Sequence, residues 1–109
     1  MRICAVILNY FGAEDTIACA RQLCAQNIER VCVVDNSADA DQAARLTAAF
    51  AGQHTIALLQ TGKNIGFAAS INYGLRHLRD AHAAEDLMQQ VLLMTLERLR
   101  AGKLRQPEK

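Results

Sequence analysis

An α/β domain in three layers is the fold that the sequence predicts: a short parallel sheet of about three strands with helices on its faces, followed by a long C-terminal helix. Three apolar runs and the helical stretches between them lead to this prediction. Alternation of strand and helix at such short spacing favours right-handed crossovers and therefore a parallel sheet. The chain has 109 residues, 51% of them apolar, which fits a single domain over residues 1–109 with one buried interior.

Three strands are expected where the apolar runs lie. The runs cover residues 2–9 (RICAVILN), 30–35 (RVCVVD) and 55–60 (TIALLQ). They are nearly continuous in apolar residues and do not alternate with polar ones, a pattern typical of strands buried on both faces of a parallel sheet. We therefore expect helices to cover both faces of the sheet.

Helices are expected between and after these strands. The first begins behind Glu14 and Asp15 and the second behind Asp39 and Asp41, where acidic residues complement the helix dipole. Asp39 and Asp41 spell the letters DxD, but their place at a helix start favours helix initiation over metal binding. A third helix begins near Gly66. All three continue with apolar residues at spacings of three and four, namely Ile17, Ala20 and Cys24, then Ala43, Leu46 and Phe50, then Ala68, Ile71, Leu75 and Leu78.

The composition bounds the location and the partners. Charged residues make up 21% of the chain and nearly cancel to a net charge of +1, so they indicate neither nucleic acid nor a membrane surface as partner. No apolar run reaches the roughly 18 residues of a membrane span, and the first residues lack the pattern of a signal peptide. We therefore expect a cytoplasmic protein without a membrane span.

The four cysteines are expected to be buried thiols. Two lie in strand-like runs and two in a helical pattern, which favours packing over disulfides. A zinc site usually shows two ligand pairs at short spacing, and only one pair of cysteines is close here. We therefore expect no bound metal. The residues are Cys4, Cys19, Cys24 and Cys32.

Candidate site residues follow the three strands, because ligands of open α/β sheets bind beyond the carboxyl ends of the strands. Asn9 and Tyr10 follow the first run and Asp35 ends the second. A carboxylate there can accept hydrogen bonds from a base or a ribose. Asn64 and Gly66 follow the third run, where glycine lets a ligand approach the backbone and helix amides favour phosphate.

Each of these residues also has a purely structural interpretation. Asp35 and Ser37 could cap the next helix. Gly66 could form an ordinary tight turn, and one glycine falls well short of a GxGxxG or GxxxxGK[ST] motif. From spacing alone both alternatives stay open.

The three segments together resemble the opening motifs of family 2 glycosyltransferases, particularly the rhamnosyltransferase-like branch. The matching stretches are AVILNYFGAEDTIACARQL, VCVVDNSADAD and KNIGFAASINYGL, in this order and at these spacings. The resemblance extends over residues 2–79. The resemblance implies the GT-A fold, a Rossmann-like arrangement in which the strands lie in the order third, second, first, with a fourth strand beside the first.

The resemblance also implies roles for the candidate residues. Asn9 and Tyr10 would flank the uracil or thymine base of a nucleotide-diphosphate sugar, and Asp35 would bind the base or the ribose. Asn64 and Gly66 would complete the wall of this pocket. In the family, the fourth strand ends in a DxD-type motif that holds Mg²⁺ or Mn²⁺ on the diphosphate, and a later carboxylate activates the acceptor hydroxyl.

The resemblance ends at about residue 79. Residues 80–109 have a helical pattern, with a helix from about Glu85 to Arg100, and we expect neither the fourth strand nor its acidic motif. The first strand would then be an edge, and residues 3–8 are too apolar for an exposed edge. We therefore expect a homodimer that forms through the last helix, through paired first strands, or through both.

Three functions follow from these expectations, and the last of them, a small free-standing nucleotide-binding protein or regulator, rests only on Asp35, Asn64 and Gly66. The first is a truncated glycosyltransferase-like protein that keeps part of the donor-base pocket and binds UDP or dTDP weakly. Without the metal motif and the catalytic base, this chain alone is expected to transfer no sugar and to need no cofactor. The alternative is a noncatalytic interaction or dimerisation module derived from the same fold.

Overall fold

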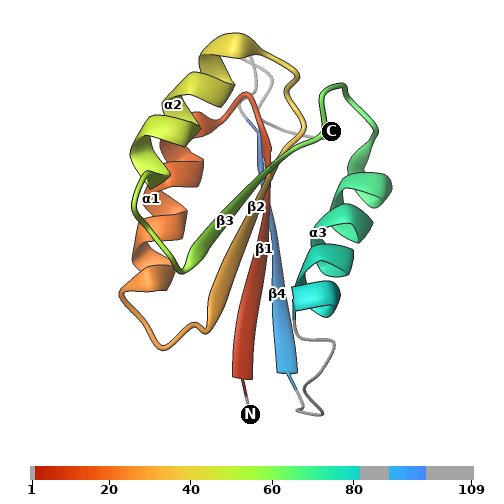
Figure 1. The fold of residues 1–109 in the computed structure, drawn as a ribbon. Coiled ribbons are helices and arrows are strands. Elements are labelled where there is room, and N and C mark those ends of the chain that lie inside the picture. Colours follow the sequence, from red (N-terminus) through yellow and green to blue (C-terminus); the bar gives the residue numbers. More distant parts are fainter. Residues whose placement is uncertain (1, 82–88, 98–109) are drawn as a thin grey trace, which may run out of the picture.

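The protein is a three-layer α/β domain, seen in a computed structural model that describes residues 2–81 and 89–97 (Figure 1). Helices α1 and α2 cover one face of a parallel sheet and α3 covers the other. In chain order the elements are β1 Arg2–Tyr10, α1 Ala13–Cys24, β2 Arg30–Asp35, α2 Ala40–Phe50, β3 Ile56–Gln60, α3 Phe67–Ala81 and β4 Gln89–Glu97. The first three strands and the first three helices confirm the sequence prediction to within a few residues.

The four strands lie in the order β3-β2-β1-β4 and are all parallel. Asn9 near the end of β1 lies in register with Asp35 at the end of β2, and Asp35 with Gln60 at the end of β3. The carboxyl ends of these strands therefore meet at one edge of the sheet, from which the candidate residues project.

The predicted C-terminal helix is wrong over residues 89–97, which form β4. This strand pairs along its whole length with β1, from Arg2 opposite Gln89 to Tyr10 opposite Glu97. Its apolar residues have helical spacing, but VLLMTL is also a short continuous run, and periodicity alone does not separate a buried helix from a buried strand. The rest of the predicted helix lies outside the described residues.

Strand β1 is consequently an inner strand with a partner on each side. The homodimer expected through paired first strands is therefore wrong in that form, because both edges of β1 are already hydrogen-bonded within one chain. The apolar run 3–8 is covered by β4. A homodimer by another surface stays a prediction.

Alternate residues of the inner strands supply two hydrophobic clusters, one on each face of the sheet. Both clusters are buried, as the continuous apolar runs predict. The cluster under α1 and α2 contains Ala5, Ile7, Val31, Val33 and Leu46. The cluster under α3 contains Cys4, Val6, Leu8, Cys32, Val34, Ile71 and Leu78.

Helix α3 packs tightly against the sheet at Gly74. A Cβ atom there would lie 2.8 Å from Cγ1 of Val6 and 3.0 Å from Cγ2 of Val34. Both neighbours are β-branched residues of inner strands, so neither methyl group moves easily. A glycine at this helical position therefore sets the distance between α3 and the sheet.

Replacing Gly74 with alanine is expected to destabilise the protein although alanine favours helices. Overpacking destabilises a core by about 1–3 kcal/mol, whereas the higher helix propensity of alanine stabilises by about 1 kcal/mol. We therefore expect the free energy of unfolding to fall by about 1 kcal/mol. Asn72→Ala on the exposed face of the same helix is the control and should not destabilise. Urea denaturation of both variants measures this difference. A Gly74→Ala variant as stable as Asn72→Ala would contradict the close contact of Gly74 with Val6 and Val34.

All four cysteines carry thiols, as expected, but only Cys4 and Cys32 are buried, and Cys19 and Cys24 are half-buried. Burial raises the pKa of the Cys32 thiol from its ordinary value of 9.0 to about 12, while the nearby charge of Arg30 acts in the opposite direction. The unfolded chain therefore releases this proton at a lower pH than the folded protein does.

The Cys32 thiol should make the protein less stable as the pH rises from 9 to 12. Its contribution is fully present below pH 9 and falls by about 1.4 kcal/mol per pH unit above it, because only the unfolded thiol ionises there. Cys32→Val should remove this part of the decrease in the free energy of unfolding with pH. Urea denaturation between pH 8 and pH 10 measures it. Equal slopes for the variant and the wild type would contradict the raised pKa.

Candidate functional site

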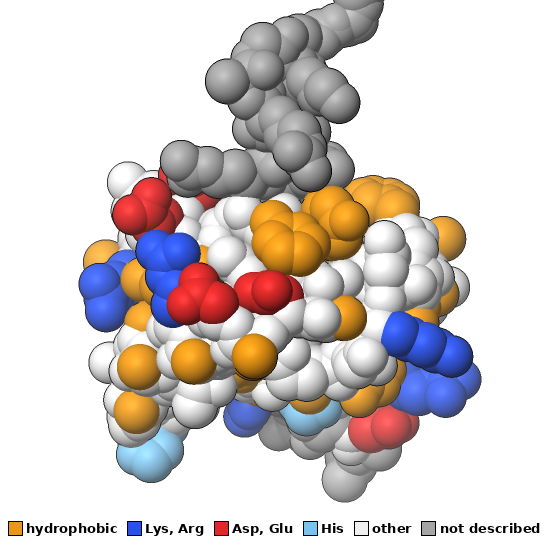
Figure 2. All heavy atoms as spheres, turned by 90° about the horizontal axis from the view of Figure 1, so that it is seen from above, with side chains coloured by type: hydrophobic (Ala, Val, Ile, Leu, Met, Phe, Trp, Pro, Cys, Tyr) orange, Lys and Arg blue, Asp and Glu red, His pale blue; other side chains and the backbone are white. Residues whose placement is uncertain are grey.

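The candidate site is the edge of the sheet where the strands end, which Figure 2 shows from above. Hydrophobic and acidic side chains lie side by side on this face. The connecting loops contain four residues with a left-handed backbone: Phe11 with φ 56°, Ala38 with φ 53°, Gly62 with φ 80° and Gly66 with φ 90°. For Phe11 and Ala38 this conformation costs roughly 1–2 kcal/mol each, so the surrounding contacts must hold them in place.

Asn9 is the centre of a buried polar network at this edge. Its Nδ2 atom donates to Oδ1 of Asp35 at 3.0 Å, to Oε1 of Gln42 at 3.1 Å and to Oγ of Ser37 at 3.3 Å. Its Oδ1 atom accepts from Oγ1 of Thr16 at 2.6 Å and from the Gly12 amide at 3.1 Å. Both hydrogens and both lone pairs of the Asn9 amide are therefore used within the protein.

Asp35 is fully buried and only half of its carboxylate is satisfied. Its Oδ1 atom accepts from Asn9 and, at 3.2 Å, from the Ser37 amide. Its Oδ2 atom is buried and has no hydrogen-bond partner among the residues that the structure describes. A buried acceptor left without a donor costs about 1–3 kcal/mol, and more when it is charged.

A second polar group lies between the ends of β2 and β3 and is built around Asn36. The Nδ2 atom of Asn36 donates to Oδ1 of Asn64 at 2.8 Å, and its Oδ1 atom accepts from the Ile65 amide and from Oγ1 of Thr61. Oδ1 of Asn64 also accepts from the Gly66 amide at 2.9 Å. Asn64 and Gly66 are therefore brought together, both exposed, at the start of α3.

The predicted site residues thus fall into two groups. Asn9 and Asp35 belong to the network beside α1 and α2, and Asn64 and Gly66 belong to the group beside α3. Successive residues of a strand point to opposite faces, which sends the side chains of Asp35 and Asn36 into different groups. The backbone joins the groups, since the Asn36 amide donates to the carbonyl of Asn9 at 2.9 Å.

Tyr10, the fifth predicted residue, is half-buried and forms an edge-to-face pair with Phe11, with ring centroids 4.9 Å apart. Phe11 is 38% exposed. Its amide donates to Oγ of Ser37 at 2.8 Å, which holds the left-handed turn after β1. Two aromatic rings therefore lie at the end of β1.

Several residues of the site received no role from sequence reasoning. Asn36 lies in a stretch that stands out in the sequence, because it directly follows Asp35 at the end of a strand. Thr61 also carries a signal, because it directly follows the third strand. Gln42 and Thr16 carry none, because each lies within a helix and meets the site only through the fold. Asp39 caps α2 by accepting from the Gln42 amide at 3.0 Å, which confirms the helix-start interpretation of this DxD.

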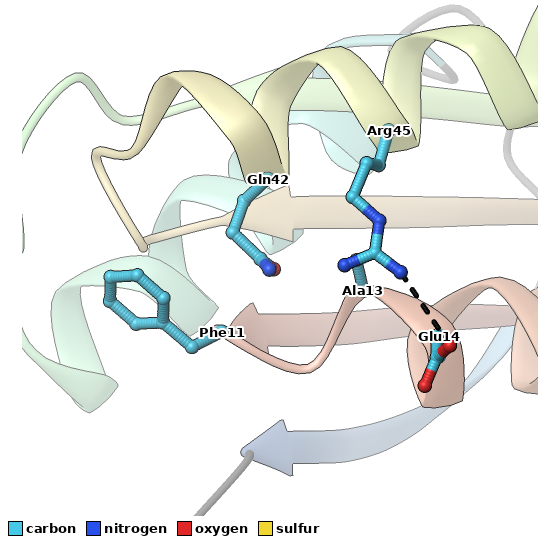
Figure 3. A pocket seen from close by; sticks show the side chains of 5 residues that line it. All are labelled: Phe11, Ala13, Glu14, Gln42 and Arg45. Carbon is cyan, nitrogen blue, oxygen red and sulfur yellow. Dashed lines mark ion pairs between the residues drawn. The ribbon is translucent and has the colours of Figure 1, made fainter.

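An open hollow of about 360 Å³ lies beside the network, between the starts of α1 and α2 (Figure 3). Phe11 lies on one side of it and the ion pair between Arg45 and Glu14, 3.7 Å long, on the other. The side chain of Gln42 reaches down from α2 between them. The wall is completed by Ala13.

Neither a metal centre nor a membrane span is found within residues 2–81 and 89–97. These residues bring together no group of three or more His, Cys, Asp or Glu side chains that could hold a metal ion. None of their helices combines the length and the apolar character that a membrane span requires.

No protein-family model matches the chain, and neither a curated protein nor a solved structure matches it.

Proposed function

We propose that this chain is a glycosyltransferase-like protein whose carboxyl edge binds the base and ribose of UDP or dTDP weakly. The observation that carries the proposal is the place of β4, which pairs in parallel with β1 in a sheet of order β3-β2-β1-β4. This is the strand order that the family resemblance implies for the first four strands. The sequence prediction had treated the fourth strand as missing.

The unsatisfied oxygen of Asp35 supports nucleotide binding. Uracil and thymine carry an N–H donor between two carbonyl groups, and ribose carries hydroxyl donors. Either donor would satisfy Oδ2 of Asp35, which lacks a partner among the described residues. Because this oxygen is buried, a ligand reaches it only if the loops around Asp35 open. Because a hydrogen bond to a charged group contributes about 1.5–3 kcal/mol, one such contact would supply much of a weak affinity.

The loops around Asp35 offer further contacts for a nucleotide. Gly66 has a left-handed backbone and open space where a Cβ would be, so a ligand could approach its backbone closely. Phe11 presents a partly exposed ring beside Tyr10. Aromatic rings stack on nucleobases with little preference for the base.

Sugar transfer itself is not proposed for this chain. Where the resemblance places an acidic pair, β4 ends in Glu97, whose Cα is in register with that of Tyr10. The next acidic residue in the sequence is Glu108. A single carboxylate does not make the paired motif that holds Mg²⁺ or Mn²⁺ on a diphosphate, so Glu97 alone does not support a metal-dependent transfer.

The alternative is a noncatalytic interaction module derived from the same fold. The burial of the Asn9 and Asp35 side chains favours it, because both are fully buried and bonded to each other. On this view their network serves only to hold the loops after β1 and β2. Nucleotide binding separates the two functions.

Titration with UDP and dTDP, followed by amide shifts near Asp35 and Gly66, tests the proposal. We expect dissociation constants in the millimolar range, about 4 kcal/mol of binding free energy, with or without Mn²⁺. Asp35→Asn should weaken binding about tenfold, because its new amide group cannot accept the ligand's hydrogen. Asp39→Asn removes the same charge at the same edge and keeps the helix cap, so it should bind like the wild type.

Three outcomes of this titration would count against the proposal. Absence of shifts at high millimolar nucleotide would favour the noncatalytic module. Equal weakening of binding by Asp35→Asn and Asp39→Asn would mean that Asp35 acts through its charge and not through a hydrogen bond to the ligand. Much tighter binding with Mn²⁺ would require a metal site that the described residues do not form.

A further inference from the structure

The turns that follow β1 and β2 are joined to each other by one hydrogen bond. The Phe11 amide, in the first turn, donates to Oγ of Ser37, in the second turn, at 2.8 Å. Among the described residues, no other hydrogen bond joins residues 11–12 to residues 36–38. The contact between the two turns therefore depends strongly on the Ser37 hydroxyl.

The backbone is strained on both sides of this hydrogen bond. Phe11 has φ 56° and Ala38, next to Ser37, has φ 53°. They are the two non-glycine residues with a positive φ in the part of the chain that the structure describes. Because a Cβ atom makes this left-handed conformation unfavourable, strain in both turns opposes the closed arrangement.

The closed turns cover the carboxylate of Asp35. This residue is fully buried, and its Oδ1 atom accepts from the Ser37 amide in the second turn at 3.2 Å. Its Oδ2 atom is buried as well and has no hydrogen-bond partner among the described residues. A donor group of a ligand can therefore reach Oδ2 only after the turns have moved.

We propose that residues 11–12 and 36–38 form a latch that closes over Asp35, and that the Ser37 hydroxyl holds it shut. The inference rests on the nucleotide binding proposed above and adds what limits its affinity. A nucleotide binds only those molecules in which the latch is open. The apparent dissociation constant is then the intrinsic one divided by the open fraction, so easier opening tightens binding by the same factor.

Ser37→Ala weakens the latch without breaking the rest of the polar network. The Nδ2 atom of Asn9 has two hydrogens and three acceptors within reach, and Oγ of Ser37 is the most distant of them at 3.3 Å. Both hydrogens therefore keep an acceptor in the variant, on Asp35 and Gln42. The main loss is the acceptor of the Phe11 amide.

Hydrogen exchange of the Gly12 amide measures opening of the latch without any nucleotide. Its acceptor, Oδ1 of Asn9, stays in Ser37→Ala, so faster exchange reports movement of the turn. We expect exchange at least about fivefold faster than in the wild type, the effect of one hydrogen bond. The dissociation constant for UDP, followed at the Gly66 amide outside the latch, should fall by the same factor.

A second variant changes the latch in the opposite direction. Ala38→Gly keeps the hydrogen bond and removes the strain, because glycine adopts a positive φ readily. Gly12 exchange should become about threefold slower and UDP binding about threefold weaker. Ser70→Ala is the control, since it deletes a buried hydroxyl of α3 without a partner among the described residues, and should change neither measurement.

The results separate the latch from nucleotide binding itself. Unchanged Gly12 exchange in Ser37→Ala would overturn the latch, because Ser37 would not hold the turns together. Faster exchange with unchanged or weaker UDP binding would overturn the latch alone and leave nucleotide binding in place. Faster exchange without UDP binding in either the wild type or the variant would contradict the nucleotide site, and the latch over that site with it.

Discussion

The buried amide of Asn9 is the interaction on which the arrangement of the site depends. Its hydrogen bonds join the end of β1 to β2, to the first turn of α1 and to the first turn of α2. An amide taken out of water costs several kcal/mol unless all its groups are paired, so these elements must meet in one arrangement. That arrangement holds the left-handed turn at Phe11, exposes the Phe11 ring and directs Gln42 into the hollow.

The alternation of side chains along β2 divides the edge of the sheet into two hydrogen-bonded groups. Asp35 joins Asn9 beside α1 and α2, whereas Asn36 joins Asn64 beside α3. Below them the same alternation separates the two hydrophobic clusters. A ligand that contacts both Asp35 and Gly66 must therefore cross the edge of the sheet, over the ends of β1 and β2. A ligand in the hollow beside Gln42 would not need to cross this edge.

Much of the fold could be predicted from the sequence, because continuous apolar runs separated by helical spacing leave few arrangements other than a parallel sheet with helices on both faces. The error at residues 89–97 arose where an apolar run satisfied both helical spacing and strand composition, and only pairing with β1 distinguishes them. In the site, Asp35 was identifiable because it ends a strand. Gln42 was not, because its role depends on the packing of α2 against Asn9.

Hydrogen exchange of three loop amides tests the central role of Asn9 most directly. The amides of Phe11, Gly12 and Ser37 donate to side-chain acceptors of this network. If the network is a single cooperative unit, they should exchange as slowly as amides within β1, and in Asn9→Ala they should exchange at least about a hundredfold faster than in the wild type. Fast exchange of all three in the wild type, at the rate of exposed loops, would contradict the account.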